Sequence, residues 1–200
     1  MRSRNISQHF GYEDERQFKT YKQHLFIDFR DFLSDVTQNT EMTITVNLTS
    51  TITLYNANNN VTSKNKSLGI PPYEYVKTAE LAAYSIPKLD DEMYIILDIP
   101  EFSTRLHSSD YDGSYDKFSI LYFDNSTMNT GDIKPMKGAN FDKKIYNFNP
   151  PDRLFNKFTI TLRKHGGDIV KLSDFGATND DTATSLMNKI SFLFIFDIKL

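Results

Sequence analysis

Two apolar runs separated by a polar turn make residues 84–102 the most prominent hydrophobic landmark of the chain. The second run, residues 93–99, is rich in β-branched and aromatic residues and too short for a typical helix, so it predicts a strand. It stops at Pro100, which lacks the N–H that a sheet ladder needs and is expected at a strand end. Because residues 94–97 are apolar without alternation, we expect a central strand with both faces covered.

Period-two alternation of apolar and polar residues predicts several further strands. The odd positions are mainly apolar in residues 23–33, and the even positions are apolar in residues 40–55, where residues 49–51 could hold a bulge or a bend. The even positions are again apolar in residues 154–164. The remaining strand patterns cover residues 73–86, 117–123, 141–148 and 190–200.

Turn and loop signals separate these strands. Residues 73–86 mix helix and strand formers, and the prolines on both sides favour a strand. Gly166 and Gly167 predict a hairpin turn, with the chain returning through residues 169–172. Polar loops are expected at residues 56–72, 103–116, 127–140 and 174–188. About eight strands without a long helix predict one all-β domain, an antiparallel sandwich or jelly roll.

The first 22 residues differ in composition from the rest of the chain. Residues 1–22 are polar and charged and offer little to a hydrophobic core, so we predict an N-terminal arm. The β domain then covers residues 23–200. We therefore expect two parts, an arm and a single folded domain.

Composition and charge narrow the range of functions that the protein could have. The chain has no cysteine, which excludes disulfides, thiolate zinc sites and cysteine nucleophiles. The net charge of -3 gives no general attraction to nucleic acid. The lysines nearest to a basic patch are few and have acidic neighbours: Lys64, Lys66, Lys134, Lys137, Lys143 and Lys144. No apolar run approaches the length of a membrane span. We expect neither specific nucleic-acid binding nor a membrane span.

The sequence shows little sign of catalytic or metal-binding motifs. There is no G-x-S-x-G motif, and the four histidines have no metal-ligand spacing: His9, His24, His107 and His165. The triplet Asp174-Phe175-Gly176 matches a kinase motif in isolation, which we interpret as coincidence. Three carboxylates alternate in one loop, at Asp110, Asp112 and Asp116. They could hold calcium, but the loop departs from the EF-hand pattern, and a solvated turn is the preferred interpretation. We predict no catalytic, cofactor or metal residues.

Several segments together resemble a known protein family. The segments are residues 76–81 (VKTAEL), 85–87 (SIP), 94–101 (YIILDIPE), 27–30 (IDFR), 149–154 (NPPDRL) and 158–162 (FTITL). A glycine hairpin and an apolar C-terminal strand complete the pattern. In their order and spacing these segments resemble the single jelly-roll penton and minor capsid proteins of large eukaryotic double-stranded DNA viruses, virophages and polinton-like elements. The likeness covers residues 23–200, except for the Asn-rich loop at residues 56–69.

The resemblance implies a single jelly-roll fold, an eight-stranded antiparallel β-sandwich, and a structural role. The protein would be the penton subunit of an icosahedral virus, located in the virion at the capsid vertex. Five copies would form a homopentamer beside trimers of a double jelly-roll major capsid protein, with other minor capsid proteins as further partners. This role needs no cofactor and no active site. We expect the contacts in residues 1–21, 56–69 and 103–116.

An alternative interpretation is a ligand- or carbohydrate-binding β-sandwich module. Loop tyrosines could stack on sugars, and the candidates are Tyr73, Tyr75, Tyr111 and Tyr115. An enzyme on a jelly-roll scaffold has the least support, because no His or carboxylate constellation is present.

Overall fold

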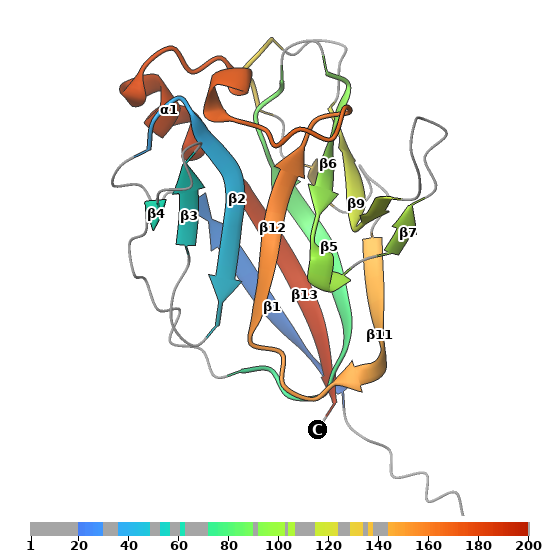
Figure 1. Cartoon of the computed structure of the whole chain (residues 1–200). Coiled ribbons are helices and arrows are strands. Elements are labelled where there is room, and N and C mark those ends of the chain that lie inside the picture. Colours follow the sequence, from blue (N-terminus) through green and yellow to red (C-terminus); the bar gives the residue numbers. More distant parts are fainter. Residues whose placement is uncertain are drawn as a thin grey trace, which may run out of the picture.

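The computed structural model describes residues 20–29, 36–48, 53–56, 61–62, 72–89, 92–102, 104–106, 115–123, 129–133, 136–137 and 144–199. Within these ranges the chain forms two antiparallel β-sheets that face each other across a hydrophobic core (Figure 1). The predicted all-β sandwich is therefore confirmed.

The first sheet, which we call sheet A, contains strands from both ends of the chain. Its order is β1 (Thr20–Asp28), β13 (Ser191–Lys199) and β5 (Val76–Ser85), and β5 also pairs with β10 (Met136–Lys137) and β11 (Lys144–Asp152). The segment 73–86, whose composition was ambiguous, is thus a strand, as predicted. The even positions of β13 and the odd positions of β1 from Leu25 onward point into the core.

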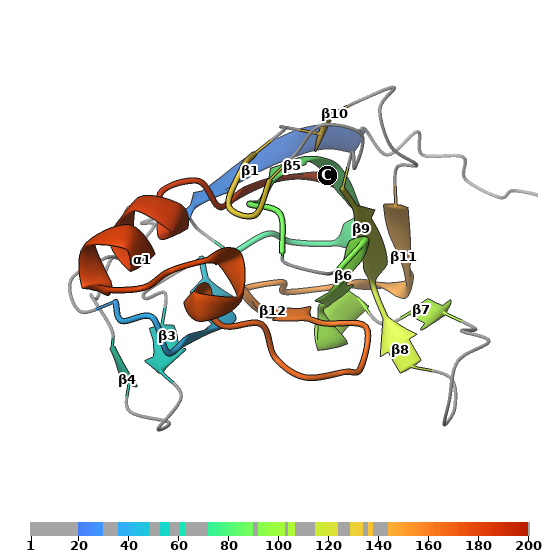
Figure 2. The ribbon, with the colours of Figure 1, turned by 90° about the horizontal axis from the view of Figure 1, so that it is seen from above.

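The second sheet, sheet B, lies in a separate layer (Figure 2). Its order is β4 (Val61–Thr62), β3 (Thr53–Asn56), β2 (Thr40–Asn47), β12 (Lys157–Arg163), β6 (Tyr94–Asp98) and β9 (Ser119–Tyr122). A separate two-stranded ribbon consists of β7 (Thr104–Leu106) and β8 (Tyr115–Lys117). The described helices are the 3-10 helices η2 (Pro100–Phe102) and η4 (Leu172–Phe175) and the α-helix α1 (Asp180–Met187).

The principal strands pair in a nested order. Counting β1, β2, β5, β6, β9, β11, β12 and β13 along the chain, the first pairs with the last and the second with the second-last. The third pairs with the third-last, and the two middle strands pair with each other. All of these pairs are antiparallel, and the β13–β5 and β12–β6 pairings join them into the two sheets. Most connections between successive principal strands therefore cross from one sheet to the other.

The core between the sheets is dominated by phenylalanine. Phe102, at the end of η2, lies at its centre and is fully buried. Its ring centroid is 5.3 Å from that of Phe158 in sheet B and 6.3 Å from that of Phe194 in sheet A. Large aromatic rings bury much apolar area each, so this cluster links the two sheets where the landmark segment 84–102 ends.

Two predicted strands differ in their extent. Residues 40–55 are not one strand, because β2 and β3 form a hairpin. Apolar residues stand at even positions on both sides of residues 49–51, so the pattern indicated at most a bulge or a bend there and not a reversal of the chain. The strand predicted to stop before the prolines at Pro150 and Pro151 instead continues through both of them as β11. Since β11 is an edge strand, the missing proline N–H groups need not interrupt a ladder between two strands.

The prediction that β6 is covered on both faces is wrong. The strand does lie inside sheet B, between β12 and β9. However, only Ile95 and Leu97 point into the core, while Tyr94 and Ile96 are half-buried on the outer face. These outer residues pack beside Tyr122 and Ile120 of the adjacent strand rather than under a second layer of described residues. Apolar side chains on both faces therefore do not require a layer on each side.

Three further features refine the predicted organisation. Strand β1 begins at Thr20, inside the predicted arm, and residues 1–19 lie outside the described residues. The ends of the predicted loop 103–116 form the β7–β8 ribbon. The polar segment 174–188 contains helix α1, which the sequence prediction missed. Its N-cap is Asn179, whose side chain accepts a hydrogen bond from the N–H of Thr182 at 2.9 Å.

Candidate functional site

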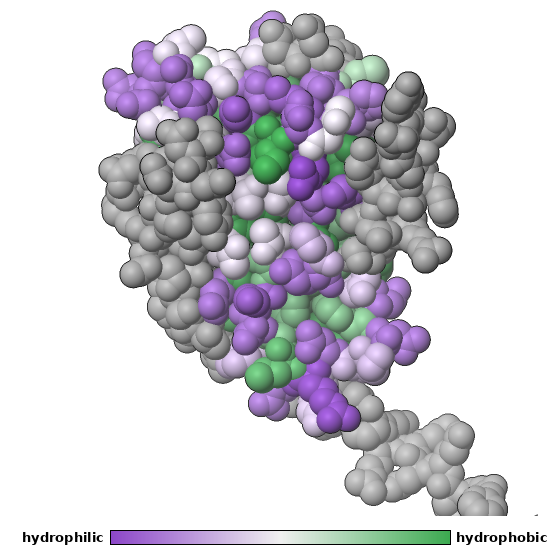
Figure 3. All heavy atoms as spheres, in the orientation of Figure 1, coloured by the Kyte–Doolittle hydropathy of each residue, from purple (hydrophilic) through white to green (hydrophobic). Residues whose placement is uncertain are grey.

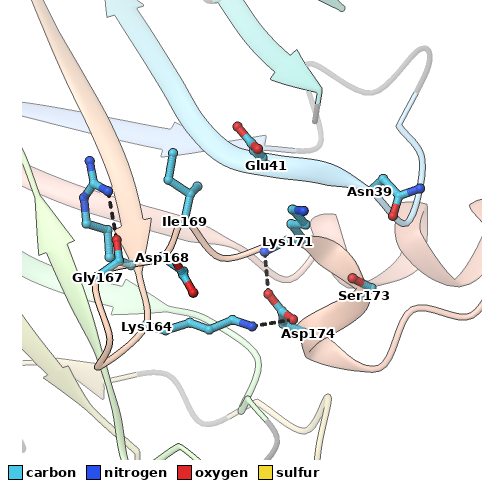
Figure 4. Close-up of a pocket in the computed structure, with 10 residues that line it drawn as sticks. Asn39, Glu41, Lys164, Gly167, Asp168, Ile169, Lys171, Ser173 and Asp174 are labelled. Atoms are coloured by element: carbon cyan, nitrogen blue, oxygen red, sulfur yellow. Dashed lines mark hydrogen bonds and ion pairs between the residues drawn. The ribbon is translucent and has the colours of Figure 1, made fainter. Parts of the chain in front are cut away.

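A polar groove of about 700 Å³ opens at one end of sheet B (Figure 4). It lies between β2, the turn after β12 and the helix η4. Its described lining includes six charged side chains, three acidic and three basic: Glu41, Asp168, Asp174, Arg163, Lys164 and Lys171. Together these six side chains carry no formal net charge. On the same side of the molecule, Figure 3 shows polar residues interrupted by small apolar patches.

The turn predicted at the glycine pair is present between Lys164 and Asp168, and it forms one wall of the groove. The N–H of Lys164 donates to the Asp168 carbonyl at 2.8 Å, and the N–H of Gly167 donates to the Lys164 carbonyl at 3.0 Å. Gly167 has φ +91°, which favours glycine. The returning chain then joins β12 to β2, because the N–H of Val170 donates to Leu162 and the N–H of Met42 donates to Val170.

Asp174 organises the opposite wall of the groove. One of its carboxylate oxygens accepts from Lys164 Nζ at 2.7 Å, and the other accepts from the N–H of Lys171 at 2.8 Å. The second bond caps the start of η4. Gly176 ends that helix with φ +89°. The triplet Asp174-Phe175-Gly176 therefore has a local structural role here, since Asp174 holds the helix and Phe175 is buried in the core.

Next to the groove, a buried carboxylate joins three strands. Asp98 of β6 is only 4% exposed. Its Oδ2 accepts from Arg163 Nε of β12 and from Lys117 Nζ of β8, each at 2.7 Å. Arg163 also donates through Nη1 to the Gly167 carbonyl at 2.9 Å. Arg163 thus connects the Asp98 cluster to the turn that walls the groove.

The chemistry available in this groove is polar recognition. Among the described residues of the lining, Ser173 is the only one with a hydroxyl group, and none is a histidine or an aromatic residue. A nucleophile needs an adjacent base, and a sugar site uses aromatic faces for stacking. The lining described here offers neither arrangement. It offers hydrogen bonds and balanced charges instead.

An aromatic cluster lies on the outer face of sheet B, beside the groove. The ring of Tyr94 is 5.9 Å from that of Tyr122 and 5.6 Å from that of His165. The Tyr94 hydroxyl also hydrogen-bonds His165 Nδ1. The planes are inclined by 60° and 84°, so the rings pack tilted or edge-on against one another and present no flat platform. The sequence did not reveal this cluster, because it depends on the β6–β9 register.

The tyrosines proposed for sugar stacking are placed very differently. Tyr73 is a core residue, 6% exposed, with its ring 5.3 Å from that of Phe196. Burial raises the pKa of Tyr73, and Tyr21 raises it further. Tyr75 is 48% exposed and has φ +51°, which is unusual for a bulky residue. Tyr115 lies on β8, and Tyr111 lies outside the described residues.

The other predicted candidates are dispersed or lie outside the described residues. His24 is exposed on β1, and His165 belongs to the aromatic cluster. Lys137 and Lys144 lie on β10 and β11 beside β5, and Asp116 lies on β8. The candidates outside the described residues are His9, His107, Lys64, Lys66, Lys134, Lys143, Asp110 and Asp112. The calcium hypothesis and most of the predicted contact loops remain predictions.

In the described part of the chain, no three His, Asp or Glu side chains gather closely enough to hold a metal ion. No described helix is long and apolar enough to cross a membrane.

No protein-family model matches the chain, and no curated protein matches it at a significant level.

Proposed function

We propose that this protein is a structural subunit of an icosahedral virus capsid, the penton that forms pentamers at the five-fold vertices. The observation that carries the proposal is the nested pairing of the eight principal strands. Pairing the first strand with the last, and so on inward, is what results when one long antiparallel ribbon is rolled into a sandwich. We take this to be a single jelly roll, a fold used by viral capsid proteins, lectins and cupins.

The segments that carry the family resemblance support this proposal. Residues 76–81 lie on the third principal strand, residues 94–101 on the fourth and its 3-10 helix, and residues 158–162 on the seventh. Each segment supplies core residues, among them Leu81, Leu97 and Ile160. The likeness thus concerns the frame of the sandwich, as a shared fold requires.

In the proposed role, the contacts between copies would build the capsid vertex. Five copies would form a ring at the vertex beside trimers of a double jelly-roll major capsid protein, with other minor capsid proteins as further neighbours. A heterologous contact closes into a ring when the rotation between copies is right. Such a subunit works through its surfaces and needs no cofactor and no catalysis.

The alternative of a carbohydrate-binding module has less support, because it depended on exposed loop tyrosines. Tyr73, one of its stacking candidates, is buried in the core, and none of the described residues that line the groove is aromatic. The exposed Tyr75 and Tyr122 remain available to a ligand, at 48% and 59% exposure. Glycan-array binding by an isolated monomer would favour that alternative over the capsid role.

The test is incorporation into particles. Capsids assembled from the double jelly-roll major capsid protein with and without this chain should differ at the five-fold vertices in averaged electron-microscopy maps. A chain lacking residues 1–19 is the matched variant, because the deletion stops before β1. It should remain folded but fill the vertices poorly. Unfilled vertices with the full chain would contradict the penton role, and normal filling by the shortened chain would contradict the role of the arm.

A further inference from the structure

Sheet A ends in two long edge strands, whereas sheet B ends in short ones. β1 and β11 each contain nine residues, while β4 contains two and β9 contains four. Among the described residues, no strand pairs with the outer side of β1 or β11. A long free edge exposes a row of N–H and C=O groups that can pair with another chain.

Each of these edges carries a large apolar side chain that is about half exposed. Phe26 on β1 is 57% exposed, and Ile145 on β11 is 49% exposed. Phe26 lies between the buried residues Leu25 and Ile27, so it points away from the core. Ile145 precedes Tyr146, which packs against the core, so it points the same way. The two residues therefore mark the outer face of sheet A at its two opposite edges.

The strand directions allow one copy to continue the sheet of the next. β1, β13, β5 and β11 are antiparallel at each step. β11 is therefore antiparallel to β1. A second copy placed beside the first can put its β1 next to β11 in the same antiparallel sense, which leaves the two sheets facing the same way.

A register that sets Phe26 opposite Ile145 matches the two faces of the sheet. Residues that point outward then lie opposite one another, and so do residues that point into the core. On the outer face the register brings His24 opposite Asn147. On the inner face it brings Leu25 opposite Tyr146 and Gln23 opposite Phe148, since opposed residues share a face. The rings of Tyr146 and Phe148 are only partly buried in the isolated chain, and the neighbouring strand would cover them.

The same register ends where the sequence of β11 requires it to end. It pairs residues 22–27 of β1 with residues 144–149 of β11 and stops immediately before Pro150 and Pro151. Proline cannot donate a ladder hydrogen bond, so the free edge of β11 is usable only up to that point.

We propose that β1 of one copy pairs with β11 of the next copy, so that sheet A continues from subunit to subunit around the ring. Each copy uses each edge once, which makes the contact heterologous and suited to closure. The expected number of five subunits rests on the proposed function, whereas the edge pairing rests on the two strands.

The absence of cysteine makes a cross-linking test direct. The variant Phe26→Cys/Ile145→Cys should form disulfides between copies, because directly opposed residues of antiparallel strands have Cα atoms about 4.5 to 5.5 Å apart, within disulfide range. Mild oxidation should give a ladder of covalent oligomers that ends at five. His24→Cys/Asn147→Cys tests the same register at a second position. The matched control is Phe26→Cys/Tyr122→Cys, because Tyr122 is 59% exposed but lies on β9 of sheet B.

The outcomes separate this inference from the proposed function. A ladder ending at five supports both. A pentamer by native mass whose two cysteine pairs both stay reduced, or cross-link no better than the control, overturns the edge pairing and leaves the penton role standing. A ladder specific to the paired cysteines that ends at another number supports the edge pairing and contradicts the five-fold vertex. Dimers formed by Phe26→Cys alone would show β1 pairing with itself, and this result also overturns the inference.

Discussion

The hydroxyl of Tyr84 in sheet A donates a hydrogen bond to the backbone carbonyl of Tyr122 in sheet B, at 3.1 Å. The Tyr84 side chain is buried, whereas the Tyr122 ring is exposed and packs against Tyr94. One bond thus ties the third principal strand to the fifth across the sandwich. It also anchors the strand that carries part of the outer aromatic cluster.

Replacing Tyr84 with Phe should lower the free energy of unfolding by about 1 to 3 kcal/mol, because the Tyr122 carbonyl would lose a partner. Equilibrium denaturation in urea at pH 7 measures the change. Tyr122→Phe is the matched control, since it keeps the carbonyl that accepts the bond, and it should have a smaller effect. Equal stability of Tyr84→Phe and wild type would show that the bond does not contribute.

Because of Tyr84, the stability of the protein should also depend on pH. Burial raises the pKa of Tyr84 from 10.0 to about 12. The folded state therefore holds this proton more tightly than the unfolded state, so the stabilisation is complete below pH 10 and is lost as the pH rises towards 12. The stability difference between wild type and Tyr84→Phe should shrink across this window. A difference that stays constant from pH 8 to pH 11.5 would contradict the assignment.

The strand pattern was largely predictable, because side chains that alternate across a half-buried sheet leave a period of two in the sequence. This holds for β12, where Phe158 and Ile160 are buried as expected. Features set by pairing between distant segments were not predictable. The reversal between β2 and β3 was missed because apolar residues stand at even positions of the sequence both before and after it. Helix α1 has only Ala183, Leu186 and Met187 buried, which is too little apolar signal for prediction among polar residues.

The candidate site was even less visible in the sequence. Asp98, Lys117 and Arg163 lie far apart along the chain, and only the registers of β6, β8 and β12 bring them together. The same applies to Tyr94 and His165. The notable isolated motif, Asp174-Phe175-Gly176, serves a helix cap. Residue types alone indicated polar loops, but not which side chains would meet.

Removing the carboxylate of Asp98 should destabilise the protein. Asp98→Asn leaves Arg163 and Lys117 without their shared anion, and these side chains are only 29% and 15% exposed. Because both cations keep some contact with water, we expect a loss of about 1 to 3 kcal/mol, below the range for fully buried pairs. Urea denaturation measures it, with Glu74→Gln as an exposed control expected to stay within about 0.5 kcal/mol. A loss no larger than that of the control would contradict a structural role for the cluster.

A substitution at Tyr75, in contrast, should increase the stability of the protein. Its φ of +51° is unfavourable for a bulky residue, and asparagine tolerates this conformation better. We expect Tyr75→Asn to raise the free energy of unfolding by about 0.5 to 1 kcal/mol. Thermal unfolding measures the shift, and Tyr122→Asn, at an exposed strand position, should be destabilising. If Tyr75→Asn also lowers stability, the ring makes contacts that outweigh the backbone strain.

Phe102 should be among the least tolerant positions. Its ring stacks near Phe155 and Phe158 and lies edge-on to Phe194, so truncation opens a cavity between the sheets. Phe102→Ala should cost about 3 to 5 kcal/mol, and Phe102→Leu distinctly less. Denaturation curves for the two variants provide the comparison. A cost below about 1 kcal/mol for Phe102→Ala would mean that the core does not depend on this residue.

The most direct test of the capsid proposal is the native mass of the full chain, measured alone and with the major capsid protein. A penton predicts a discrete species of about 116 kDa, five times the chain mass of 23.2 kDa. A chain that remains a 23.2 kDa monomer at all concentrations, with and without that partner, would contradict the account.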